Sequence, residues 1–350
     1  MNSMKNVLKV TLFLIAGYFL VSGLVSAQNF FAPLVTGLIL ALVVLPFVQL
    51  LERKKWPKTL SAITGTLVVL LASVAILFLF SLQVKKFVAD WPSIQEEMKP
   101  KLEQVKAYIT ANTPLTKKDL SISDKSAAFM PSRERASSIL GSFTGFVGNY
   151  LLCLIYIYFL LRYRSKFRQF LLRVFSDEKR DQVEPILQES SSVAPQYLIG
   201  KLMLMGILAI LYSIGLGISG VDNYILVSLL AATFTLIPYI GNLIGICLAV
   251  ALGYLTSGDI MTLVGILITF SVAQFIENYV LEPFIVGDRV DLHPFVVILV
   301  VVMGNMIWGV IGMVLAIPVT AILAVVLLNI PKLKPYGVLI SKQEFKPSKG

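Results

Sequence analysis

The stretch "FVVILVVVMGNMIWGVIGMVLAIPVTAILAVVLL", residues 295–328, decides the fold class of this chain. It is longer than the roughly 20 apolar residues that cross a hydrocarbon core of about 30 Å as a helix. The run is interrupted by "GNMIWG" at 304–309 and then by Pro318, and glycine and proline both weaken a helix. These residues therefore predict a membrane helix that is broken or re-entrant.

A second apolar stretch, residues 224–255, has the same construction. It is interrupted by "PYIGN" at 238–242, and each half of about 13 residues is too short to cross a bilayer alone at 1.5 Å per residue. This stretch is either one kinked helix or a re-entrant pair of half-helices. Non-helical backbone at membrane depth is tolerated only where it is buried in protein or lines a cavity.

Both breaks carry a Gly-Asn pair, and paired interrupted spans indicate the binding site of a transporter. We therefore predict a substrate-binding role for five residues of the breaks, namely Pro238, Gly241, Asn242, Gly304 and Asn305. The alternative is that the breaks serve only close packing between helices, because glycines let helices approach and proline kinks are common in membranes.

The composition agrees with a membrane protein. Charged residues make up 14% of the chain and the mean hydropathy is +0.82, whereas about a quarter of the residues in a soluble domain are charged. We predict an all-α polytopic membrane protein of about eight transmembrane helices, two of them broken or re-entrant near the C-terminus. The apolar spans are 7–27, 30–51, 59–83, 138–161, 199–219, 224–255, 259–281 and 295–328.

These spans divide the chain into four predicted parts. They are an N-terminal three-helix membrane segment (1–83), an amphipathic polar linker (84–137), a transport core with broken helices (138–330) and a basic cytoplasmic tail (331–350). Basic residues after the second, fourth and eighth spans share one side, so the positive-inside rule puts both termini in the cytoplasm of a bacterium, at its inner membrane. The first span resembles a secretory signal, but its length and the apolar segment that follows favour a retained helix.

The charge and the few reactive side chains exclude several functions. A net charge of +10 in a membrane chain indicates contact with anionic lipid rather than nucleic acid. Cys153 and Cys247 both lie in apolar runs and the chain has one histidine, so we expect no disulfide, metal site or cofactor. The chain has no Walker A motif and no motif of an intramembrane protease, so we expect no enzyme.

The span at 259–281 becomes polar near its end. Gln274, Glu277 and Asn278 lie three and four residues apart, which places them on one helical face, and Glu282 continues the line from Asn278. A glutamate at bilayer depth costs at least about 2.5 kcal/mol unless it faces a cavity or finds a partner. Desolvation favours its protonated form, which suits a proton carrier. We predict that Gln274 and Asn278 bind substrate and that Glu277 and Glu282 couple transport to protons or ions; if Glu277 lies only at the interface, it is an ordinary helix-end acid.

The residues after this span predict a turn. In "VGDRVDLHP" Gly287 relaxes the backbone, His293 is a capping residue and Pro294 begins the next span. We assign these three residues a structural role.

Several segments in this order resemble the autoinducer-2 exporter family of bacterial membrane proteins. They are "YIYFLLRYRSKFRQFLLRVF", "YLIGK", "PYIGNLIG", "ENYVLEPFIVGDRVDLHP" and "GVIGMVLAIPVTAIL". The resemblance implies eight spans and export of the quorum-sensing furanone, although some members are described as sodium or lithium/proton antiporters. Asn242 stands where this family commonly has proline and Asn305 where it commonly has glycine, which puts the substrate in doubt.

The leading hypothesis is a secondary transporter that exports a small polar solute, with autoinducer-2 as a candidate, and that couples export through Glu277. Sodium(lithium)/proton antiport is the alternative, with a monovalent cation as the transported partner. A third reading, from another class, is a non-transporting membrane scaffold. We also expect a homo-oligomer.

Overall fold

The computed structural model describes residues 2–112, 133–174, 177–237, 240–254, 257–286 and 291–344. Within those ranges the chain is helical and no strand is present. The α-helices are α1 (Asn2–Ser26), α2 (Gln28–Arg53), α3 (Lys58–Asn112), α5 (Arg133–Val174), α6 (Asp177–Ile218), α7 (Tyr224–Phe234), α8 (Ile240–Ala249), α10 (Ile260–Ile276), α11 (Glu282–Ile285), α12 (Pro294–Asn329) and α13 (Lys334–Ile340). Two π-helical segments, Val250–Tyr254 and Glu277–Leu281, continue α8 and α10.

The predicted membrane character is confirmed. Six helices are long and apolar enough to cross a membrane, and they are Gln28–Arg53, Lys58–Leu82, Gly145–Val174, Arg180–Ile218, Ile260–Ile285 and Pro294–Asn329. Shorter apolar helices occupy Leu14–Ser26, Tyr224–Phe234 and Gly241–Tyr254. Large apolar side chains such as Phe19, Phe78 and Phe284 are exposed, which fits a surface that faces lipid. The protein is therefore an all-α polytopic membrane protein. Helix α3 also runs past its apolar part, through the first portion of the predicted linker, to Asn112.

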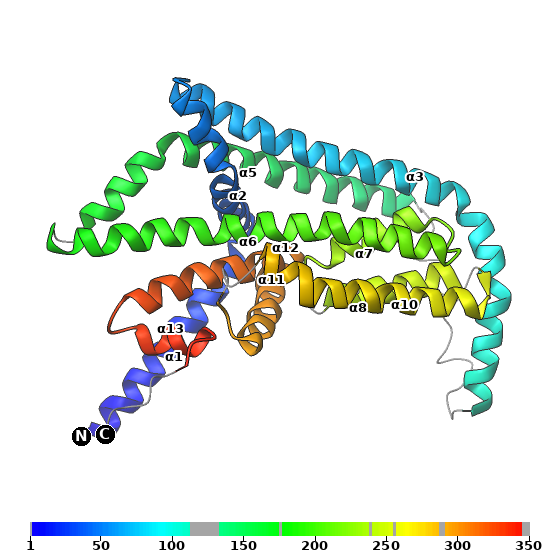
Figure 1. The fold of residues 1–350 in the computed structure, drawn as a ribbon. Helices are drawn as coiled ribbons and strands as arrows, with labels where there is room; N and C mark the ends of the chain where they lie inside the picture. Colours follow the sequence, from blue (N-terminus) through cyan, green and yellow to red (C-terminus); the bar gives the residue numbers. More distant parts are fainter. Residues whose placement is uncertain are drawn as a thin grey trace. The chain divides into compact units, whose positions relative to one another are not determined.

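The chain forms two compact units, and the second comprises residues 71–148 and 200–287. In this unit the stretch at 224–255 is a hairpin of two half-helices, α7 and α8, which pack against each other (Figure 1). A Cβ added to Gly241 would overlap the carbonyl of Phe234, and one added to Gly245 would lie 3.0 Å from Ala231 Cβ. Residues seven apart in a straight helix are about 10 Å apart, so the chain reverses between α7 and α8. Of the two interpretations open from the sequence, the structure shows the re-entrant pair.

Helices α6 and α10 pack against each other beside this hairpin. A Cβ on Gly215 of α6 would overlap Thr269 of α10, and one on Gly265 of α10 would overlap Ser219, which directly follows α6. These two pairs run in opposite directions along the chain, so α6 and α10 are antiparallel and meet through small residues, as membrane helices do. Tyr212 of α6, which is fully buried, stacks on Phe270 with ring centroids 4.5 Å apart.

The first unit comprises residues 1–70, 149–199 and 288–350. Its core joins α2, the start of α3 and α5 through Val48, Ala62 and Ile157, all fully buried. At one end of these helices Arg164 of α5 forms an ion pair with Glu52 of α2, and Arg162 donates to the hydroxyl of Thr59. Basic residues of this part of the chain thus also hold the helix ends together.

Helix α12 is a second hairpin, also in the first unit. Its backbone is non-helical at Trp308 and at Gly309, where φ is 60° and ψ is −139°, a combination that strongly favours glycine. A Cβ on Gly312 would overlap the Gly304 carbonyl, although residues eight apart in a straight helix are about 12 Å apart. The indole of Trp308 donates to the Leu24 carbonyl of α1 at 3.0 Å, which holds the hairpin tip against α1.

The two ends of this second hairpin lie together, as a reversal requires. The His293 amide before α12 donates to the Ile340 carbonyl of α13 at 3.0 Å, and the Lys342 amide donates to Asp291 Oδ1 at 3.3 Å. A straight helix of 36 residues would separate its ends by about 54 Å. Residues 295–328 are therefore not one straight helix but a helical segment that reverses its direction.

Candidate functional site

Five polar side chains of the second unit meet near the tip of the α7–α8 hairpin. They are Lys201 of α6, Asn242 of α8, Gln274 and Asn278 of α10 and its π-helical continuation, and Glu277 at the start of that continuation, and we call them the polar cluster. The nearby surfaces of α6 and α10 are apolar, with Leu204, Leu208 and Phe270 buried. The cluster is thus a polar patch inside an apolar bundle.

The centre of the polar cluster is an ion pair. Lys201 Nζ lies 3.3 Å from Glu277 Oε1, and the two side chains are only 9% and 7% exposed. A charge taken out of water at this depth is tolerated when it is paired and hydrogen-bonded. Glu277 begins a π-helical segment, a local defect that often occurs at functional sites.

Gln274 links the ion pair to the hairpin. Its amide nitrogen donates to Glu277 Oε2 at 3.3 Å and to Asn278 Oδ1 at 2.9 Å. Its amide oxygen accepts a hydrogen bond from the side-chain nitrogen of Asn242. A continuous hydrogen-bonded chain therefore runs from the ammonium of Lys201 to the first turn of α8.

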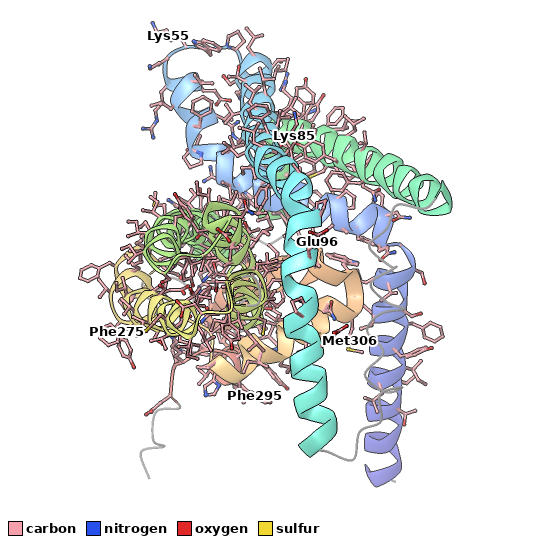
Figure 2. The ribbon with its side chains drawn as sticks, turned by 90° about the vertical axis from the view of Figure 1, so that its right-hand side faces the viewer. Lys55, Lys85, Glu96, Phe275, Phe295 and Met306 are labelled. Atoms are coloured by element: carbon pink, nitrogen blue, oxygen red, sulfur yellow. The ribbon has the colours of Figure 1, made fainter. Side chains whose placement is uncertain are left out.

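Helix packing explains why these residues meet. A Cβ on Gly200 would lie 3.3 Å from the Ile285 carbonyl. Helix α6 therefore passes close to α11 at the residue before Lys201. Gly215 of α6 lies opposite Thr269 of α10. Because the two helices are antiparallel, Glu277 then lies opposite a position of α6 between Lys201 and Tyr212. Phe275, on the opposite face of α10, is 60% exposed and lies at the outer edge of these helices (Figure 2).

Two buried polar atoms near the polar cluster have no hydrogen-bond partner among the described residues. They are Asn242 Oδ1 and the Tyr212 hydroxyl. An unpaired polar atom in an apolar setting costs about 1–3 kcal/mol, and such atoms often face a ligand or water. Asn242 Oδ1 can accept a hydrogen bond, and the Tyr212 hydroxyl can donate or accept one.

The polar cluster lies away from the end of an apolar helix. Glu277 comes eight residues before the end of Ile260–Ile285, which is about 12 Å along the helix. The 11 residues of α7 are about 16 Å long, about half the thickness of a 30 Å hydrocarbon core.

Of the other predicted site residues, those that the structure describes are not members of the polar cluster. Gly241 forms the close approach at the α7–α8 tip, while Gly304 and the exposed Asn305 belong to the α12 hairpin of the first unit. Glu282 is exposed on α11, and among the described residues its carboxylate makes no hydrogen bond or ion pair with the polar cluster. His293 is the N-cap of α12, accepting from the Phe295 amide at 3.3 Å, and Pro294 is the first residue of that helix. Pro238 and Gly287 lie outside the described residues.

Lys201 and Tyr212 were not among the site residues predicted from the sequence. Lys201 is the only charged residue of the apolar span at 199–219, and a lone charge in such a span is by itself a sign of function. Tyr212 carries no comparable signal, because a tyrosine in an apolar helix is ordinary. Only its burial and its missing partner draw attention to it.

The polar cluster offers a neutralised charge pair and three carboxamides. The carboxylate of Glu277 can accept a proton, and the carboxamides can donate to and accept from hydroxyl groups. Within the described ranges, no group of three or more His, Cys, Asp or Glu side chains could hold a metal ion. The side chains of the cluster can therefore form hydrogen bonds with a solute and take up or release a proton.

Comparisons with known proteins agree with a transport role. The sequence profile described as "AI-2E family transporter" matches residues 8–332. The chain is 27% identical to "Putative transport protein YueF" of Bacillus subtilis over 333 residues, 89% of this chain and 86% of that protein. It is 23% identical to "Putative transport protein" of Haemophilus influenzae over an alignment of 356 residues, which covers 98% of this chain and 99% of that protein. The chain thus belongs to the AI-2E transporter family of multi-pass membrane proteins.

Proposed function

We propose that this protein is a secondary transporter that exports a small polar solute across the bacterial inner membrane and couples export to protons through Glu277. The observation that carries the proposal is the buried Lys201–Glu277 pair, joined through Gln274 to Asn242 at the tip of a re-entrant hairpin. Half-helices that meet at the midplane beside a charged side chain are a recurring design of substrate sites in transporters.

Coupling follows from the ion pair. When a proton binds Glu277, the attraction to Lys201 disappears, and the ammonium is left without its counter-charge. A site that holds a neutral carboxyl and a free ammonium differs in charge from one that holds the pair, so protonation and solute binding influence each other. Glu282 remains part of the proposal as an exposed acid near the same helix end, where it would deliver or receive the proton.

The carboxamides indicate an oxygen-rich solute. Asn242 Oδ1 is ready to accept from a hydroxyl, and the first turn of α8 presents the partial positive charge of a helix N-terminus to oxygen atoms. Gln274 and Asn278 add donors and acceptors on one side. Autoinducer-2, which carries several hydroxyl groups, is the candidate solute, and Gly241 allows the close approach at the hairpin tip. A substrate-binding role for Pro238 remains part of the proposal. Gly304 and Asn305 give the α12 hairpin a similar tip in the proposal.

The two hairpins leave the proposed orientation unchanged. A re-entrant hairpin returns to the side from which it came, so replacing two predicted crossings by two hairpins keeps both termini on one side, and the positive-inside rule puts that side in the cytoplasm. The turn near Asp291 then lies on the cytoplasmic side with the C-terminal tail, as its hydrogen bond to Lys342 requires. A homo-oligomer and contact with anionic lipid belong to the same proposal.

Cation/proton antiport is the second candidate. It is favoured by the buried carboxylate of Glu277 and by the Asn278 amide oxygen, which shares the Gln274 amide nitrogen with that carboxylate, because carboxylate and amide oxygens are the usual ligands of hard cations. In this alternative a proton and a sodium or lithium ion compete for Glu277.

Inverted membrane vesicles test both candidates in one preparation. Uptake of the furanone and sodium-dependent proton flux are measured for the wild type, Glu277→Gln and Glu282→Gln. We expect proton-driven furanone uptake that Glu277→Gln lowers at least about a hundredfold, the lower end of the effect that general acid–base groups have on the steps they serve. Glu282→Gln should lower uptake less than Glu277→Gln, because its side chain is exposed and water can pass on the proton in its place. Asp222→Asn, at an exposed acid outside the polar cluster, is the control and should leave uptake unchanged.

Sodium-dependent proton flux that disappears in Glu277→Gln, without furanone uptake, would replace solute export by antiport. A well-folded wild type that shows neither activity would support the scaffold interpretation instead.

A further inference from the structure

We propose that Lys201 is a specificity-determining residue, whose tethered ammonium fills the cation position beside Glu277 and so excludes free sodium and lithium ions from the polar cluster. The inference deepens the proposed function, on which it rests for the identity of the site, by naming the class of solute that the site accepts. It also gives a role to Lys201, which with Glu277 makes up the buried charged residues among those that the structure describes.

The first argument is the occupancy of the carboxylate. Oε1 of Glu277 faces the Lys201 ammonium at 3.3 Å, and Oε2 accepts from the Gln274 amide nitrogen at 3.3 Å. Each oxygen thus has one donor directed at it from within the protein. A sodium ion that binds this carboxylate must take the place of the ammonium.

The second argument is the cost of that replacement. The Lys201 side chain is 9% exposed, and it lies on the same face of α6 as the buried Leu204 and Leu208. A displaced ammonium would remain in apolar surroundings without a counter-charge, which is far less favourable than an ammonium in water. Because Lys201 is held on a rigid helix, its effective concentration at Glu277 is also at least millimolar, as it is for any short tether.

The third argument is what remains when Lys201 is removed. Glu277 would keep a full negative charge at 5% residue exposure, with the Gln274 amide nitrogen still donating to Oε2 and with Oε1 left without the ammonium. A buried carboxylate with one oxygen unpaired attracts a small cation. The native site, in contrast, carries no net charge and suits an uncharged solute with hydroxyl groups.

Thermal unfolding of purified protein tests the inference without any transport measurement. The wild type, Lys201→Ala and the double variant Lys201→Met/Glu277→Gln are heated in sodium chloride, lithium chloride, methylammonium chloride or choline chloride at equal ionic strength. We expect Lys201→Ala to gain at least about 3 °C in Tm in sodium, lithium or methylammonium relative to choline, because a ligand that binds only the folded state raises Tm. The wild type and the double variant should not respond.

Methylammonium serves as a free replacement for the removed side chain, and choline is too large for the vacated position. A sodium-dependent rise in the wild type that is lost in the double variant would overturn the proposal, since the cation position would then be open in the native protein. This wild-type comparison decides the matter even if Lys201→Ala does not fold in any salt. A folded Lys201→Ala that responds to none of the small cations would also overturn it.

The result is independent of the vesicle assay. If furanone uptake fails but Lys201→Ala gains a cation response, the proposed solute falls while the role of Lys201 stands. If uptake is confirmed and Lys201→Ala shows no such response, the transport function stands and the role of Lys201 falls.

Discussion

The buried ion pair predicts a strong coupling between Lys201 and Glu277 in the stability of the protein. At 3.3 Å and an effective dielectric constant of about 20, two unit charges attract each other by about 5 kcal/mol. Both side chains are less than a tenth exposed, so the small values of surface pairs do not apply. Removing one partner of a buried pair costs about 3–5 kcal/mol, because the other charge is left without compensation.

The double-mutant cycle follows from these magnitudes. Lys201→Met and Glu277→Gln should each lower the free energy of unfolding by about 3–5 kcal/mol, and the double variant should return to within about 2 kcal/mol of the wild type. Glutamine at position 277 keeps an acceptor for Gln274, so its cost reports mainly the orphaned ammonium. Equilibrium unfolding in detergent by titration with a denaturing surfactant, followed by circular dichroism, measures each variant. Glu282→Gln, which is exposed, should stay within about 0.5 kcal/mol.

The outcome that refutes this reasoning is additivity. If both single substitutions cost less than about 1 kcal/mol and the double variant shows their sum, the two charges are solvated and do not form a buried pair. The charge-based interpretation of the polar cluster would then have to be abandoned, together with the coupling role of Glu277.

Three further predictions concern the hairpins and the buried hydroxyl. Gly312→Ala should unfold at a temperature several degrees below the wild type, because its Cβ would overlap the Gly304 carbonyl. Gly23→Ala on α1, which has open space around it, is the control and should not lower the melting temperature. Equal melting temperatures of Gly312→Ala and the wild type would contradict the α12 hairpin. Tyr212→Phe should leave the free energy of unfolding unchanged or raise it by up to about 1 kcal/mol, because the lost hydroxyl has no partner among the described residues; a loss above about 1 kcal/mol in denaturant titration would show that it has one. In a variant without native cysteines, a single cysteine at Ser257 should react with a membrane-impermeant thiol reagent from the same side as one at Asp222, since α7 and α8 enter and return; labelling from opposite sides would favour a single kinked crossing.

Much of the fold was predictable because its signals are local. Apolar runs longer than a bilayer core identify the membrane helices, and Gly-Asn pairs identify the two breaks. The spacing of Gln274, Glu277 and Asn278 predicts a shared helical face, and the structure places all three in one hydrogen-bonded group. Each of these inferences depends only on residues within a few helical turns of one another.

The remaining features depend on contacts between residues far apart in the sequence. Whether residues 224–255 and 295–328 cross or return is decided by how tightly their halves pack, at Gly241 against Phe234 and at Gly312 against Gly304. The partner of Glu277 is Lys201, 76 residues away, and Asn242 reaches Gln274 over 32 residues. The periodicity of apolar residues does not reveal such pairings, because it describes one helix at a time.

The sequence by itself therefore determined that the chain is a helical membrane protein with two broken spans and an acid inside a third. The tertiary structure decided that the breaks are hairpins and that the acid is neutralised by a lysine. The physical reason is that antiparallel packing of α6 on α10 through Gly215 and Gly265 sets which side chains face each other. A buried charge then takes the counter-charge that this packing brings within reach.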